Sequence, residues 1–232
     1  MNTISIDTYV ADIVTAVPKS ADIFRSYRID YCCGGKTTLS EATASRGLKA
    51  EDVLSEIRTI EGERASQNSM DPASFGEKTL VAYIQERYHE YLRKELKNLR
   101  PYVTRVAKVH GEKNPHLLEI RETFVTLSEE LIDHTDDEDK NVFPLILEFL
   151  TNPTKELKEK VKPHIAELES EHDNAGKLLF RLRDLTNDFT PPAGACGTYR
   201  LVYARLEELE KDTFEHVHLE NNILFDRVRA AI

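Results

Sequence analysis

The feature that most constrains the fold of this chain is an H-x-x-x-E motif that occurs twice. His134 and Glu138 form the first copy, and His216 and Glu220 form the second. On an α-helix two residues four apart differ by only about 40° around the axis, so they project from one face, one turn apart. Each motif therefore predicts a helix that offers two metal ligands on the same face.

A further histidine precedes each motif at nearly the same distance. His89 lies 45 residues before His134, and His172 lies 44 residues before His216. The chain thus repeats one plan, a helix with one His followed by a helix with a His and a Glu. Four such helices in a bundle would direct four imidazoles and two carboxylates to one interior site. The predicted metal ligands are His89, His134, Glu138, His172, His216 and Glu220.

The repetition favours a metal site over ordinary helix-stabilising pairs. A single His and Glu at this spacing is weak evidence, because such pairs stabilise a helix slightly and acidic faces are often only solvated. Both copies, however, continue into an apolar residue and a phenylalanine, Val142-Phe143 and Leu224-Phe225. Burying two carboxylates there would cost several kcal/mol unless a cation neutralised them. Imidazole and carboxylate ligands without thiolate suit iron, with manganese or zinc as alternatives.

We therefore expect two non-haem iron ions with an oxo or hydroxo bridge, each held by two histidines and both bridging glutamates. The remaining histidines are expected at the surface or in caps: His110, His116, His164 and His218. His218 lies two residues from His216, about 200° around the helix, and should face away from the site. Glu130 and Glu171 are candidates to orient a ligand imidazole, or are simply exposed.

The sequence predicts an all-α chain with two parts. Residues 1–62 read as a small domain of short helices, and residues 63–76 contain almost nothing apolar and read as a linker. Residues 77–232 should form a four-helix bundle in which Pro101 kinks a helix or marks a register change. The expected bundle helices span about 78–109, 115–152, 154–188 and 196–230.

Adjacent cysteines in the first part are the other candidates for chemistry. Cys32 and Cys33 precede two glycines, which permit positive φ and a close backbone approach. The pair is either a turn of small residues or a pair of accessible thiols that binds iron, accepts a nitrosyl group or exchanges disulfides. We predict a functional thiol pair, with a thiol relay as its hypothetical role. Cys196, at a helix start, is predicted to pack.

Composition narrows the class of protein. The 232 residues are 40% hydrophobic, enough for a core, and the net charge of −10 disfavours nucleic acid. No apolar run reaches the ~20 residues that a membrane span needs, and the first residues lack the pattern of a signal peptide. Three cysteines cannot form a disulfide framework. These features predict a cytoplasmic protein with reduced thiols and no membrane contact.

The motifs together resemble a known family. The segment 30–39, Asp-Tyr-Cys-Cys-Gly-Gly-Lys-Thr-Thr-Leu, is similar to the ScdA-like N-terminal domain of the iron-sulfur cluster repair di-iron proteins, the RIC family. The histidine segments resemble that family's hemerythrin-like domain: residues 87–89, 134–144, 171–173 and 216–225. One departure is Asp226, where the family pattern has Pro, at a position that is not a ligand.

This resemblance implies a non-haem di-iron centre on the six ligands already predicted. It further implies repair of iron-sulfur clusters damaged by nitrosative or oxidative stress, with damaged or apo iron-sulfur proteins as partners, nitric oxide as a candidate ligand, and a homodimer in the cytoplasm. Our interpretation is a protein that supplies iron rather than a turnover enzyme. Two alternatives stay open, a di-iron nitric oxide or peroxide reductase and an oxygen or nitric oxide sensor.

Overall fold

The computed structural model describes residues 4–64 and 71–232, with the side chains of 62–64 excepted. Helices account for nearly all of the regular structure in this part of the chain, and its one β-bridge joins Tyr9 to Thr38. The predicted all-α class is therefore confirmed. The chain divides into two compact units, unit 1 with residues 1–76 and 214–230 and unit 2 with residues 77–213 and 231–232.

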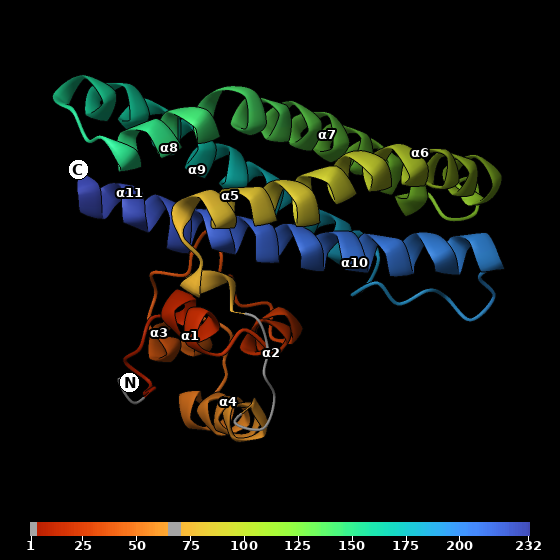
Figure 1. Ribbon diagram of the computed structural model, residues 1–232. Helices are drawn as coiled ribbons and strands as arrows, with labels where there is room; N and C mark the ends of the chain where they lie inside the picture. The colour runs from red at the N-terminus through yellow and green to blue at the C-terminus, as the bar shows by residue number, and fades with distance from the viewer. Residues whose placement is uncertain (1–3, 65–70) are drawn as a thin grey trace. The chain divides into compact units, whose positions relative to one another are not determined.

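Unit 2 is built from four long helical runs that lie side by side (Figure 1). The runs are α5 (Glu77–Ile84), η2 (Gln85–His89) and α6 (Glu90–His110); α7 (His116–Asp137), η3 (Glu138–Val142) and α8 (Phe143–Thr151); α9 (Lys155–Leu185); and α10 (Gly197–Leu219), which passes from unit 2 into unit 1 at Phe214. Both η2 and η3 are five-residue π-helices. The expected helix positions agree with these runs.

The third run shows why the sequence forms these helices. Thr154 caps α9 by accepting a hydrogen bond from the backbone N–H of Leu157 at 3.2 Å. Its buried apolar residues recur at helical spacing and face the core: Val161, Ile165, Leu168, Leu179 and Leu182.

Two prolines lie inside long helices. Pro101 is within α6 and Pro163 is within α9. The helix α6 continues through Pro101, and the π-helix η2 ends twelve residues before that proline, at His89. A proline inside a helix removes one backbone hydrogen bond. A long helix that packs on both sides of the proline can tolerate this loss.

Ion pairs fix the unit 2 part of α10 against the neighbouring runs. They join α10 to α6, η2 and α9: Arg205 to Glu95 at 2.7 Å, Arg87 to Asp212 at 2.9 Å, and Arg183 to Glu210 at 2.7 Å. Glu210 is fully buried and Arg183 nearly so. A buried carboxylate needs such a partner, so these pairs set the register of α10 within the bundle.

Unit 1 contains short helices and the C-terminal helical segment. Its elements are α1 (Val10–Ala16), α2 (Ser20–Ser26), α3 (Leu39–Ala44), α4 (Ala50–Arg64), the 3₁₀ helix η1 (Pro72–Ser74), the end of α10, the π-helix η4 (Glu220–Leu224) and most of α11 (Phe225–Ala231). Thr38 and Glu41 form a capping box that starts α3. Tyr31 is buried here, edge-on to Phe214 and 5.8 Å from the His218 ring centroid.

The predicted linker at 63–76 is described only in part, since residues 65–70 lie outside the described residues. Its last residues are ordered by Arg227, which donates to the carbonyl oxygens of Phe75 at 2.6 Å and Ala73 at 2.8 Å. These contacts fasten η1 to α11 within unit 1.

Candidate metal centre

Three of the four helical runs change to a π-helix beside a predicted ligand. His89 ends η2, Glu138 begins η3 and Glu220 begins η4. A π-turn holds an extra residue within an otherwise α-helical run, which redirects side chains, and such turns are frequent at functional sites. The two H-x-x-x-E motifs thus share more than spacing, since each places its glutamate at the first position of a five-residue π-helix.

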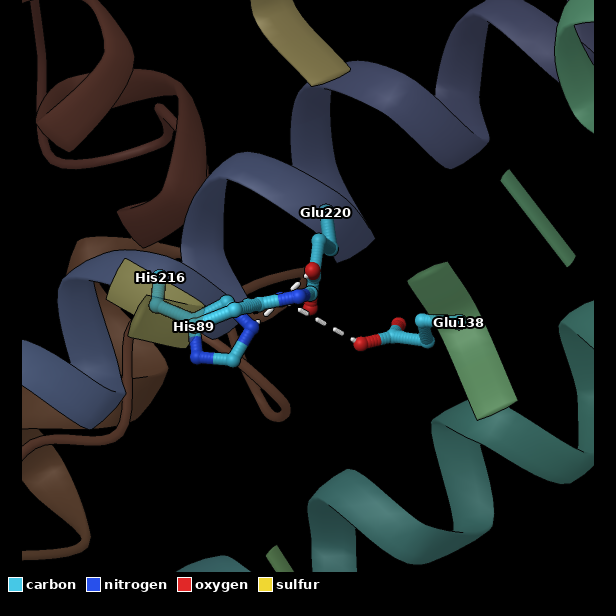
Figure 2. A group of neighbouring side chains, drawn as sticks. All are labelled: His89, Glu138, His216 and Glu220. Atoms are coloured by element: carbon cyan, nitrogen blue, oxygen red, sulfur yellow. Dashed lines mark hydrogen bonds and ion pairs between the residues drawn. The ribbon is translucent and has the colours of Figure 1, made fainter. Parts of the chain in front are cut away.

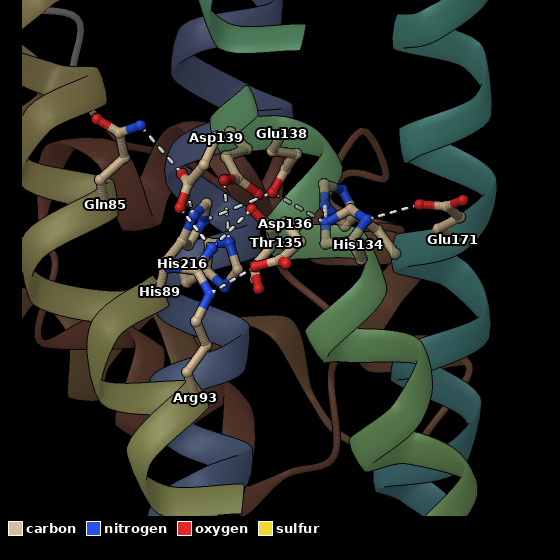
Figure 3. A network of polar contacts seen from close by, with 12 residues as sticks. Gln85, His89, Arg93, His134, Thr135, Asp136, Glu138, Asp139, Glu171 and His216 are labelled. Carbon is tan, nitrogen blue, oxygen red and sulfur yellow. Dashed lines mark hydrogen bonds and ion pairs between the residues drawn. The ribbon is translucent and has the colours of Figure 1, made fainter. Parts of the chain in front are cut away.

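His89 is held by a polar network that sequence analysis did not find (Figure 3). Its Nδ1–H donates to Asp139 Oδ1 at 2.7 Å, and the same oxygen accepts from Gln85 Nε2 at 3.0 Å. Arg93 binds the other Asp139 oxygen and also donates to Asp136. Although burial opposes it, the hydrogen bonds from His89, Arg93 and Gln85 lower the pKa of Asp139 to about 2.

His134 has an equivalent carboxylate partner on another helix. Its Nδ1–H donates to Glu171 Oε2 at 2.6 Å, and this hydrogen bond lowers the pKa of Glu171. Glu171 therefore orients His134 rather than its own neighbour His172. His172 is buried, and its Nε2 lies 2.9 Å from His134 Nε2.

These hydrogen bonds leave the other nitrogen of each ring with a lone pair for a metal. With Nδ1 protonated in His89 and His134, the neutral rings present Nε2 as an acceptor. Both Nε2 atoms face Glu138 Oε2, at 3.5 Å from His89 and 3.2 Å from His134. Glu138 is fully buried and neither of its oxygens has a hydrogen-bond partner. Such a cluster of buried acceptors needs a cation or added protons, so these residues fit a metal.

The second motif supplies the remaining predicted ligands. His216 and Glu220 are fully buried, and His216 Nε2 lies 2.9 Å from Glu220 Oε1. Two groups of potential ligands share both glutamates, and within each group one donor atom per residue lies within 4.8 Å of the others. The groups are His89, Glu138, His216 and Glu220 (Figure 2), and His134, Glu138, His172 and Glu220. Each group has two imidazoles, and both glutamates belong to both groups.

The other histidines have different surroundings. His218 belongs to neither group; it is buried in unit 1 beside Tyr31, its Nε2 lies 3.2 Å from Thr15 Oγ1, and burial lowers its pKa to about 4 despite a backbone hydrogen bond to Tyr31. His116 Nε2 contacts the hydroxyls of Tyr199 and Tyr203 at 3.0 and 3.3 Å. His218 is therefore buried and not at the surface as we expected, although it does face away from the predicted metal ligands.

His110, His164 and Glu130 also lie outside both groups. His110 Nε2 is 3.4 Å from the exposed Cys196 thiol, which precedes α10. Cys196 is therefore not packed in the core as we predicted, and it contacts His110 at the surface. Glu130 is exposed on α7.

Asp30 organises the turn that carries the adjacent cysteines. One carboxylate oxygen accepts from the backbone N–H groups of Cys32 and Cys33, both at 3.0 Å, and the other accepts from Gly34 N–H at 3.0 Å. Gly35 is needed for a close approach, because a Cβ there would lie 2.4 Å from the Tyr31 carbonyl oxygen. Neither glycine of the pair uses the positive φ that we had allowed for them.

The two thiols are unequal. Cys32 is buried, Cys33 is half-buried, and their sulfur atoms are 3.6 Å apart. The hydrogen bond with Cys33, burial and the Asp30 charge together raise the pKa of the Cys32 thiol well above its ordinary value. Asp30, Cys32 and Cys33 nevertheless form a third group whose donor atoms lie close enough to hold a metal ion.

Comparison with known proteins matches two segments of the chain to family models. Residues 80–228 match the family model of the hemerythrin HHE cation binding domain, and residues 6–61 match a domain of unknown function called ScdA_N. The iron-sulfur cluster repair protein ScdA of Staphylococcus haemolyticus is 40% identical over 95% of this chain and 97% of its own. The iron-sulfur cluster repair protein YtfE of Escherichia coli is 34% identical over 97% of each chain.

Proposed function

Because the chain belongs to the family of iron-sulfur cluster repair proteins with a hemerythrin HHE cation binding domain, we propose that it repairs damaged iron-sulfur clusters by supplying iron. The observation that carries this proposal is the fully buried Glu138, whose two oxygens have no hydrogen-bond partner while two imidazole nitrogens face one of them. A bound cation would give this arrangement a favourable energy, because it would neutralise the buried carboxylate and use the imidazole lone pairs.

We propose two iron ions as the native load. His89 and His216 would hold one and His134 and His172 the other, with Glu138 and Glu220 shared, as the two ligand groups suggest. A non-haem pair of this kind, with an oxo or hydroxo bridge, would supply iron for exchange, since these protein ligands alone would not close either ion. The protein's own contribution is to fix two imidazoles through Asp139 and Glu171.

The orienting carboxylates give the two proposed positions different environments. Asp139 has an exposed side-chain fraction of 19% and is held by Arg93, whereas that of Glu171 is 46%. A hydrogen bond to a carboxylate sets the tautomer of an imidazole and makes it a stronger ligand. A carboxylate open to water orients its histidine less firmly, which suits a site that must release its metal.

We propose further that Cys32 and Cys33 receive iron or a nitrosyl group and pass it to the client. The close grouping of Asp30 with both thiols supports a transient ligand set there. Metal binding would have to displace the proton that Cys32 retains, so this set favours brief occupancy. The variant Cys32→Ser/Cys33→Ser should keep its iron and its helical signal but lose repair; full repair by this variant would exclude the relay.

The repair function is tested by mixing the iron-loaded protein with an iron-sulfur enzyme whose cluster has been damaged by nitric oxide. The client's activity and cluster absorption should return, and the Glu138→Gln variant should restore neither. Turnover of nitric oxide or peroxide with an added reductant would instead favour the reductase alternative. Reversible gas binding without iron loss would favour the sensor.

The location and assembly of the protein are also proposals. No helix in the described part of the chain is long and apolar enough to cross a bilayer. We propose a cytoplasmic homodimer that acts on damaged iron-sulfur proteins, and the assembly is tested by light scattering of the purified chain. A monomer at cellular concentrations would exclude the dimer.

A further inference from the structure

The peptide group between Cys32 and Cys33 is held at both of its ends. Its N–H, on Cys33, donates to Asp30 Oδ1 at 3.0 Å. Its carbonyl oxygen, on Cys32, accepts from Asn222 Nδ2 at 2.9 Å and from Asn221 Nδ2 at 3.3 Å. The backbone between the two thiols is therefore bound directly to two side chains of the C-terminal helical segment.

Those asparagines belong to the π-helix that begins with a predicted ligand. Asn221 and Asn222 follow Glu220 directly in η4. A π-turn is less regular than an α-turn and depends on outside contacts to persist. The Cys32 carbonyl, which accepts from two consecutive residues, is such a contact, so the turn containing Glu220 is stabilised by the peptide that joins the thiols.

The same thiols are placed to react with each other. Their sulfur atoms are 3.6 Å apart in the reduced form, so each thiol lies within reach of the other once the peptide between them turns. Cys33 is half-buried, so an oxidant in solution can reach one thiol while the other lies directly behind it. A reachable thiol beside a second thiol is the usual setting of a reversible redox site.

We propose that Cys32 and Cys33 are a redox modification site, and that the disulfide between them releases the hold of Asn221 and Asn222 and loosens the turn that carries Glu220. With hydrogen peroxide as oxidant, Cys33 sulfur attacks one oxygen and water leaves. Cys32 sulfur then displaces the second oxygen as water, forming the S–S bond. Two thiols and one peroxide thus become one disulfide and two waters.

The coupling follows from the size of the ring. A disulfide between neighbouring residues closes a ring of eight atoms that includes the peptide group itself. Disulfides usually join Cα atoms about 4.4–6.8 Å apart, whereas consecutive Cα atoms are about 3.8 Å apart. Closing the ring therefore requires the peptide to turn, which moves the Cys32 carbonyl oxygen away from both asparagines and the Cys33 N–H away from Asp30.

This inference deepens the proposed function, because it makes oxidation the event that promotes iron release. Only its link to iron release rests on the proposed function. Disulfide formation and the loosening of η4 can both be measured without iron or a client protein. A failed repair assay would therefore leave this proposal intact, and a failed disulfide would leave the proposed function intact.

The chemical step is tested in the full chain carrying Cys196→Ser, which removes the exposed thiol. Trypsin releases the peptide 29–36, which contains both cysteines. After peroxide treatment, this peptide should lose the mass of two hydrogens and regain it with dithiothreitol. The Cys33→Ser variant should show no such loss. Absence of the loss in the parent chain would overturn the proposal.

The structural step is tested by hydrogen exchange of the metal-free chain. Peptides covering residues 214–230 should exchange several-fold faster after oxidation, and iron-loaded protein should release iron to a chelator correspondingly faster. In the Asn222→Ala variant the reduced chain should already exchange faster, and oxidation should add less than in the parent. Asn98→Ala, at an exposed position on α6, is the matched control and should behave as the parent. Disulfide formation with unchanged exchange in 214–230 would overturn the coupling.

Discussion

At the scale of single residues, the metal centre depends on which nitrogen of each imidazole carries the proton. Asp139 and Glu171 fix that proton on Nδ1 of His89 and His134, which leaves Nε2 directed at Glu138. Because each orienting carboxylate comes from a different helix, the two rings are set independently. A cation held by these two nitrogens would compensate the charge of Glu138.

Replacing Glu138 with Gln should empty the site while keeping its shape. The amide has nearly the same volume but no negative charge, so it cannot bridge two cations and its N–H₂ would face an imidazole nitrogen. Iron per chain, measured by plasma emission, should fall to a small fraction of the parent value. Glu130→Gln, at an exposed position on the same run, should keep full iron. Equal iron in both variants would contradict the ligand assignment.

His216 and His218 should respond oppositely to alanine substitution. His216→Ala removes a predicted ligand and should abolish iron retention. His218→Ala should keep the iron but lower the melting temperature. The cavity left beside Tyr31 should reduce the free energy of unfolding by about 1–3 kcal/mol. Iron analysis and thermal melting distinguish the two effects. Loss of iron in both would mean that His218 takes part in binding.

At the scale of elements, the helical period predicted the runs and the ligand faces but not the π-helices. The spacing of His134 and Glu138 is compatible with an α-turn, and nothing in Glu138–Val142 differs in composition from an α-helix. A π-turn is decided by what surrounds it, so it requires the packed structure. Asp139 was missed for the same reason, since its partner His89 is 50 residues away.

Deleting Asn141 should convert the π-turn η3 into a regular α-helical turn and so test what the π-turn contributes. This exposed residue lies within η3, where one residue is extra relative to an α-helix, so its loss can restore the regular helix with little change in the flanking turns. The variant should melt cooperatively but retain less iron, because Glu138 is redirected. Circular dichroism and iron analysis of the same sample measure both.

Deleting Asn174 provides the contrast. It is exposed in α9, which contains no π-turn, so its loss rotates the rest of that helix by about 100°. This variant should lose cooperative melting. Comparable stability of the two deletions would show that η3 is not a removable insertion.

At the scale of the whole molecule, the sequence located both family domains but could not show what the N-terminal part contacts. The segment 214–230 belongs to unit 1, where Tyr31, Cys32 and Lys36 contact it. Long-range contacts of this kind leave no periodic signal in a sequence. The segment that carries His216 and Glu220 therefore packs against the N-terminal residues of unit 1.

Removing residues 1–76 should therefore weaken iron retention without preventing folding. All six predicted ligands remain in residues 77–232, so the truncated chain should be helical and bind iron when freshly loaded. It should then lose iron to a chelator faster than the full chain, because Phe214 and His218 lose the packing of Tyr31 and the η4 asparagines lose the Cys32 carbonyl. A full chain cut at a protease site inserted between residues 64 and 71 is the control. It keeps every residue that contacts the C-terminal segment and should release iron slowly while the pieces stay associated. Equal release rates for the truncated and full chains would show that residues 1–76 do not stabilise the segment that carries His216 and Glu220.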